Sequence, residues 1–148
     1  MNIDTLIHET AEAIRGIEKL HDTEIFEEDL GDVAQNIEVA IGQQARCVTV
    51  GWNGCDHVAT QQGTGEDPDA LLVQANINVA VFEMPVVNRA NDGAPRLLGM
   101  AAAIAKAVDN LGTEDMDEGL HFVKITPIQE LDRGVITCDV VFRTKNSI

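Results

Sequence analysis

The residues best suited to chemistry are Cys55-Asp56-His57, which place a thiol, a carboxylate and an imidazole at consecutive positions. With Cys47 or His121 they would make a zinc site, and the Cys55 thiolate beside His57 would be a nucleophile. Ligands in structural zinc sites usually come as CxxC or HxxxH pairs, which these are not. The neighbouring residues also supply no oxyanion hole and no third group to orient the imidazole. We therefore favour a strand end with a buried cysteine and an exposed histidine, and we assign no catalytic residue and no metal ligand.

Two polar segments suggest ligand binding at first sight. The acidic run Glu114-Asp115-Met116-Asp117-Glu118-Gly119 would attract calcium, but it lacks the alternating ligands and the distal glutamate of a calcium loop. Gly63-Thr64-Gly65 is followed by Glu66 and Asp67 instead of a lysine and a hydroxyl residue, so it would repel a phosphate. The first segment is interpreted as a solvated loop and the second as a source of flexibility, and no cofactor is expected.

Composition narrows the class of protein further. The 148 residues contain 10 Lys and Arg against 25 Asp and Glu, which gives a net charge of −15. A chain of this length typically forms one domain, here residues 1–148, and the shortage of cations argues against nucleic-acid binding. No apolar run is long enough to span a membrane, and residues 1–10 lack the features of a secretory signal. Three cysteines without a CxxC pair indicate reduced thiols, so we expect a protein that starts in a cytosol.

The N-terminal segment has the periodicity of an amphipathic helix. Apolar residues spaced three and four apart predict this helix over residues 3–20, with Asn2 or Asp4 as its cap. Gly16 is expected to weaken the helix without breaking it. The acidic stretch 21–32 that follows is interpreted as a loop or a short helix.

Two strands follow in the pattern. Residues 46–52 are rich in β-branched side chains and end at Asn53-Gly54, which predicts a strand. The polar segment 60–69 predicts an exposed loop. Strict alternation over residues 71–81 predicts a strand with one covered face, and Pro85 ends it.

The C-terminal half repeats this order of elements. Helical spacing predicts a helix over residues 95–111, with Pro95 at its first position and Gly112 as its C-terminal cap. Residues 122–126 and 135–143 predict the two strands of a second hairpin, with Gly134 in the turn.

These elements together define an α+β fold. The order is helix, hairpin, helix, hairpin, which predicts a mainly antiparallel sheet with the two helices packed on one face. High acidity, few aromatic residues and no catalytic constellation favour a structural or assembly role.

One family shares this pattern. The element order, together with Ile77-Asn78-Val79-Ala80-Val81-Phe82-Glu83-Met84-Pro85-Val86-Val87-Asn88-Arg89 running into the helix at 95–111, resembles the tail terminator, or tail completion, proteins of tailed bacteriophages and prophages. The resemblance covers about residues 44–144. It offers no functional residue to carry over, and the acidic stretch 21–32 departs from it.

The resemblance implies a virion assembly protein without enzymatic activity. It would form a homo-oligomeric ring, a hexamer in the family, that caps the tail tube and joins it to the head. Its partners would be itself, the tail tube protein and head–tail connector proteins, with no nucleic acid and no membrane. It would reside in the host bacterial cytoplasm during assembly and then in the virion tail. The loop 60–69 would project from such a ring toward tube or connector subunits.

Three alternatives remain open at this point. Another tail tube or head–tail connector component would share the same pattern. A small-molecule-binding domain is less favoured, because four Phe, one Trp and no Tyr offer little aromatic lining for a pocket. An enzyme that uses Cys55, His57 or His121 is the third.

Overall fold

The computed structural model describes residues 1–28, 33–58 and 71–148. The helices are α1 (Ile3–Arg15), α2 (Val33–Gln44), α3 (Pro85–Asn88) and α4 (Leu97–Val108), with 3₁₀ turns at Glu18–Leu20 and Asp132–Gly134. The strands are β1 (Glu24–Glu27), β2 (Arg46–His57), β3 (Leu72–Glu83), β4 (His121–Ile125), β5 (Gln129–Glu130) and β6 (Ile136–Ser147). Among the described residues, none of the helices has the length and apolarity needed to cross a bilayer.

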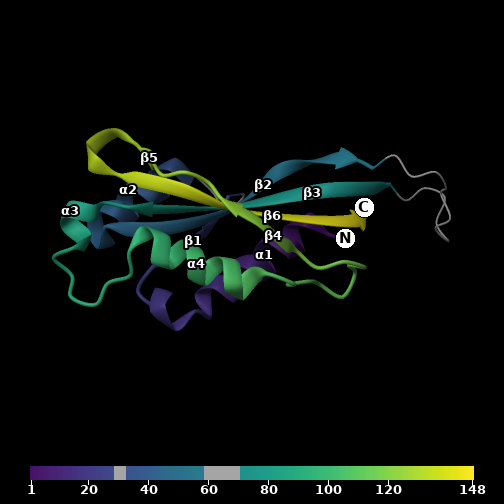
Figure 1. Ribbon diagram of the computed structural model, residues 1–148, viewed down its shortest axis with the longest axis horizontal. Coiled ribbons are helices and arrows are strands. Elements are labelled where there is room, and N and C mark those ends of the chain that lie inside the picture. The colour runs from purple at the N-terminus through teal and green to yellow at the C-terminus, as the bar shows by residue number, and fades with distance from the viewer. Residues whose placement is uncertain (29–32, 59–70) are drawn as a thin grey trace.

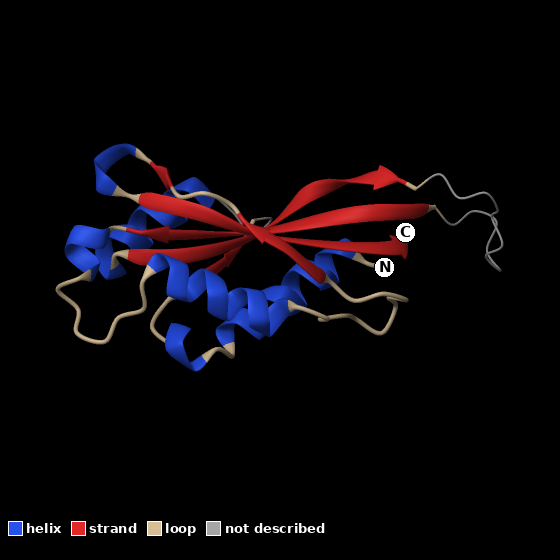
Figure 2. Ribbon diagram, viewed as in Figure 1, coloured by secondary structure: helices blue, strands red, loops and turns tan. Residues whose placement is uncertain are grey.

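The strands form one sheet, in the order β1-β2-β3-β6-β4, and β5 pairs with β6 beside β4 (Figure 1). Every pair is antiparallel except β1 with β2, which run parallel. The long strands β2, β3 and β6 extend past the helices at one end of the molecule (Figure 2). The expected α+β fold with a mainly antiparallel sheet is therefore correct.

The central strand β3 confirms the alternation seen in the sequence. Every second residue of β3 is buried, from Val73 to Glu83, and Ile77 and Val79 have no exposed surface. The inward side chains of β2 and β6 stand beside them, since Val50 pairs with Val79 and Phe142 with Ile77. This inner face of the sheet is the floor of the main hydrophobic core.

Two helices cover the inner face, as predicted. Leu6 and Ile14 of α1 and Met100 and Ile104 of α4 are fully buried in the core cluster that contains the inward residues of β3. Asn2 caps α1, because its side-chain oxygen accepts a hydrogen bond from the backbone N–H of Thr5 at 2.9 Å. The face predicted to be apolar is therefore the face that the helices bury.

The segment predicted as a loop or short helix is the largest error of the sequence interpretation. Its residues 24–27 form β1, an edge strand parallel to β2, and residues 29–32 lie outside the described part of the chain. The following helix α2 was not predicted, and it packs on the opposite, outer face of the sheet. There Ala40 and Ile41 of α2 contact Cys47, whose side chain points away from the main core.

Three predicted boundaries also need correction. The first helix ends at Gly16, which serves as its C-terminal cap instead of lying within it. Asn53-Gly54 does not end the strand but forms a β-bulge, where the register with β3 shifts and Gly54 adopts a φ of 81°. The helix predicted over 95–111 covers only Leu97–Val108, with Arg96 and Asp109 as its caps. The loop 60–69 and Gly63-Thr64-Gly65 lie outside the described residues.

Candidate interaction surface

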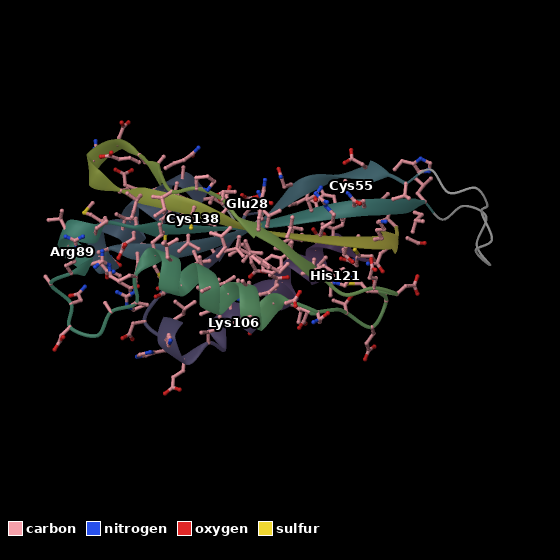
Figure 3. All side chains as sticks on the ribbon, in the orientation of Figure 1. Glu28, Cys55, Arg89, Lys106, His121 and Cys138 are labelled. Atoms are coloured by element: carbon pink, nitrogen blue, oxygen red, sulfur yellow. The ribbon has the colours of Figure 1, made fainter. Side chains whose placement is uncertain are left out.

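The candidate catalytic residues lie at the end of β2 that is remote from the helices. Cys55, Asp56 and His57 are all exposed, so the expectation of a buried cysteine at this position is wrong. His57 and Cys55 pair with Val73 and Ala75 of β3, whereas Asp56 points to the other face. His121 lies on β4 at the far side of the sheet, and its imidazole is 3.4 Å from Glu118 (Figure 3). The described residues contain no group of three or more His, Cys, Asp or Glu side chains that could hold a metal ion.

The other two cysteines are buried. Burial raises the pKa of the Cys47 thiol to about 12, with a further contribution from the nearby charge of Glu24. Burial likewise raises the pKa of the Cys138 thiol to about 11, assisted by the charge of Asp139. Because the thiolate is the nucleophile and the metal ligand, both groups stay protonated and unreactive near neutral pH.

The acidic run 114–119 is held against β6 by hydrogen bonds. The Asn146 side chain accepts hydrogen bonds from the backbone N–H groups of Asp117 and Glu118, at 2.7 and 3.2 Å, and donates one to the Glu118 carbonyl. Thr144 also donates to that carbonyl, at 2.7 Å. These contacts give the segment a structural role in closing the core between α4 and β4.

A buried polar cluster lies where β2, β3, α3 and α4 meet, and the sequence interpretation did not find it. The Glu83 carboxylate is 1% exposed and accepts hydrogen bonds from Asn88 at 2.5 Å and from Arg96 at 2.7 Å. Asn88 is bonded on its other side to Arg46, which donates to the Asn88 side-chain oxygen at 3.2 Å. Arg46 also donates to Thr23 at 2.9 Å.

This cluster fixes the entry into α4. The N-cap residue of α4, Arg96, makes no side-chain hydrogen bond to the first turn of the helix. Glu83 takes over this role, because it accepts a hydrogen bond from the backbone N–H of Leu97. The sequence carried a signal for it, because the alternation of β3 places Glu83 on the same face as Val81 and therefore inside. A carboxylate buried in this way needs partners, and the cluster supplies them.

Exposed apolar side chains gather along one edge of the sheet. Phe122 and Val123 of β4, Ile128, and Leu131 just after β5 are between 39% and 47% exposed. We name these four residues the edge patch. Contact with the core holds the Phe122 ring in place, because this ring packs edge-on against the ring of the buried Phe142 at a centroid distance of 6.2 Å. Phe122 stands beside Phe142 of β6, and β5 stands beside Ile136 and Thr137, so the patch consists of two short apolar stretches along the same edge. Apolar side chains on an outermost strand are typical of a surface that another protein covers.

A hollow continues the edge patch toward α4. It has a volume of about 480 Å³ and lies between α4 and β4. Its lining consists of Ala102, Ala105, Lys106, Asp109, Asn110, Phe122 and Ile125. The small side chains of α4 leave this space open beside the Phe122 ring. A docking partner would therefore contact both the protruding edge patch and the hollow next to it.

The likeness of this chain to known proteins is one of fold. No protein-family model matches the chain, and no curated protein matches it. Among solved structures, it is similar to a chain in the virion of a native gene transfer agent (GTA) particle, with a TM-score of 0.52 and 13% sequence identity. The match covers 99% of this chain and 95% of that one. At this identity the likeness shows a shared fold, and it extends over nearly the whole length of both chains.

Proposed function

We propose that the protein is a structural component of a virion, and specifically a tail terminator, or tail completion, protein of a tailed phage or prophage. It forms a ring that caps the tail tube, stops the tube from growing and provides the surface to which the head joins. Its action is steric and non-covalent, because a ring bound to the last tube subunits occupies the surface on which the next subunits would add.

The observation that carries this proposal is the likeness of fold to a chain from an assembled virion over nearly the full length of both chains. The edge patch supports an assembly role independently, because exposed apolar side chains on an outermost strand offer a partner a surface to cover. On this proposal the protein assembles in the host cytoplasm and is carried in the virion.

A tail tube subunit or a head–tail connector component is the second candidate. The same observation favours it, since the similar chain is described only as part of a virion. A tube subunit would be present in many rings along the tail. A terminator or a connector would be confined to the junction between tail and head.

Electron microscopy of particles produced without this protein distinguishes the three roles. Loss of a terminator gives headless tails of uncontrolled length, and adding back the purified protein restores joining to heads. Loss of a tube subunit gives no tails at all, and loss of a connector gives tails of normal length that stay unjoined. Particles of normal length with attached heads would contradict every one of these roles.

A further inference from the structure

We propose that the edge patch on β4 and β5 of one copy docks against the β1 edge of a second copy, in a repeated head-to-tail contact. This inference rests on the proposed ring and names the two surfaces that build it. β1 and β4 are the two outermost strands of the same sheet, so each copy offers both surfaces at once (Figure 1). A contact between unlike surfaces is heterologous, and it closes into a ring when the rotation between copies permits.

Charge distinguishes the two edges. Lys124 of β4, Arg143 and Lys145 of β6, and Lys106 of α4 make no ion pair in the part of the chain that the structure describes. Of the acidic groups beside them, Glu118 pairs with His121 and Asp109 accepts a hydrogen bond from the Phe122 N–H at 2.9 Å. Lys124, Arg143 and Lys145 lie on the outer face of the sheet, whereas Lys106 lines the hollow beside α4. In a chain of net charge −15, the three unpaired cations on the outer face favour an acidic partner surface.

The β1 edge supplies the acidic surface on the outer face of the sheet, whereas toward α1 the guanidinium of Arg15 donates to the Ile25 carbonyl at 2.9 Å and pairs with Glu27. Glu24 and Glu28 are exposed and make no ion pair within the described residues. The Glu28 carboxylate lies over Gly51 of β2, where a Cβ would collide with it, so it stands one strand in from the edge and Glu24 is the exposed carboxylate of β1 itself. The half-buried ring of Phe26 lies between the two glutamates in the sequence.

The faces of the sheet match as well as the charges. Glu24 pairs with Cys47, and Lys124 pairs with Val141, so both side chains point to the outer face of the sheet. When the β4 edge of one copy meets the β1 edge of the next, Lys124 stands beside Glu24 on that shared face. Two identical β4 edges facing each other would instead bring the free cations together, which disfavours a symmetric dimer.

Side chains, not an extended hydrogen-bonded sheet, make this contact. The register between β4 and β6 shifts between Phe122 and Lys124, and Pro127 separates β4 from β5. A bulge and a proline both hinder the addition of a further strand. The edge is therefore protected against open-ended aggregation while its apolar side chains stay available to a specific partner.

Cross-linking tests the proposal directly. In a Cys55→Ser background, which removes the exposed thiol, the variants Lys124→Cys and Glu24→Cys are made singly and together and treated with a short bis-maleimide. We expect a ladder of covalent multimers from the double variant and no multimers from either single variant. The matched control combines Glu24→Cys with Arg89→Cys, an exposed cation on the turn after α3, and should give no ladder (Figure 3).

A second measurement separates charge from packing. Val123→Ser should raise the protein concentration needed for half-assembly about tenfold, the effect of losing one apolar contact worth ~1.4 kcal/mol. Val86→Ser, at an 81% exposed position on α3, should leave it unchanged. Lys124→Glu should weaken assembly, and adding Glu24→Lys should restore it.

The proposal is overturned by covalent dimers from Lys124→Cys alone, by no ladder from the double variant, or by a chain that stays monomeric at every concentration. These outcomes do not decide the proposed function. A ring observed at tail ends by microscopy together with failed cross-linking would retain the terminator role and reject only this interface.

Discussion

The strands β3 and β4 both pair with β6, one on each side, yet they use their apolar residues in opposite ways. β3 buries every second side chain between two neighbouring strands and under two helices, and it pairs with β6 without a break in register. β4 has a free edge, a shifted register and apolar side chains that stay about two-fifths exposed. The comparison indicates that β3 serves the stability of one chain, whereas β4 is shaped for contact with another.

The largest effect is expected for a substitution in β3. Ile77→Ala removes a fully buried side chain from the floor of the core and should cost about 2–5 kcal/mol of unfolding free energy. Phe122→Ala on β4 should cost only about 1 kcal/mol, since its ring is already 41% exposed. Urea denaturation of both variants measures the difference, and equal losses would show that β4 is part of the stabilising core.

The second prediction compares the buried carboxylate of Glu83, which pairs with Arg96, with a carboxylate in an exposed ion pair. Glu83→Gln keeps one oxygen as acceptor for Asn88 and Arg96, but it removes the charge that pairs with Arg96 and turns an amide donor toward the backbone N–H of Leu97, so it should cost about 2 kcal/mol. The matched control is Glu38→Gln, which breaks an exposed pair with Arg133 and should cost less than about 1 kcal/mol. Thermal unfolding of the two variants checks this, and a Glu83→Gln variant as stable as the control would refute the structural importance of the buried cluster.

Thiol reactivity sharpens the contrast between exposed and buried positions on the sheet. Near neutral pH a thiol reagent should modify Cys55 quickly, while Cys47 and Cys138 react only after unfolding, because burial raises their pKa to about 12 and about 11. The measurement is the number of thiols titrated per chain before and after adding denaturant. Rapid modification of Cys47 in the folded protein would contradict its position beneath α2.

The smallest effect concerns Asp139 on β6, between β3 and the segment that joins β4 to β5. Burial raises the pKa of its carboxyl above the ordinary value, so the folded state holds this proton more tightly than the unfolded state. The stability that this group contributes is present below its unfolded pKa of 3.8 and is lost as the pH rises through the folded pKa.

Asp139→Asn should therefore raise Tm near neutral pH by a small amount. The gain should vanish below about pH 4, where the wild-type carboxyl is itself uncharged. Melting curves of the two proteins across this pH range test the prediction. A variant less stable than wild type near neutral pH would show that the carboxylate has a favourable partner.

The sequence predicted the parts of the fold that depend on strict periodicity. The alternation in residues 71–81 identified β3, and the spacing of three and four identified α1 and α4 together with the face that they bury. β1 was missed because it is short and because it has a single inward apolar residue, Ile25. The glutamates at positions 24 and 27 made the segment resemble a polar loop in the sequence. Its pairing with β2 comes from the packing of the whole chain, not from a local preference.

The candidate surface was harder to predict than the fold. Composition alone does not distinguish an apolar residue on an edge strand from one in the core. Phe122 and Val123 were therefore predicted only as part of a strand. Only the strand order places β4 at the edge, and that order depends on β6 returning between β3 and β4. Conversely, Cys55-Asp56-His57 was a candidate site because of its residue types. Among the described residues, these side chains belong to no group that could hold a metal ion.

Cryo-electron microscopy of assembled particles tests the central claim most directly. The account predicts one ring of this chain per tail, at the junction between the end of the tail tube and the head, with the β4 edge of each copy against the β1 edge of the next. Density for this chain repeated along the tube, or its absence from the particle, would contradict the account.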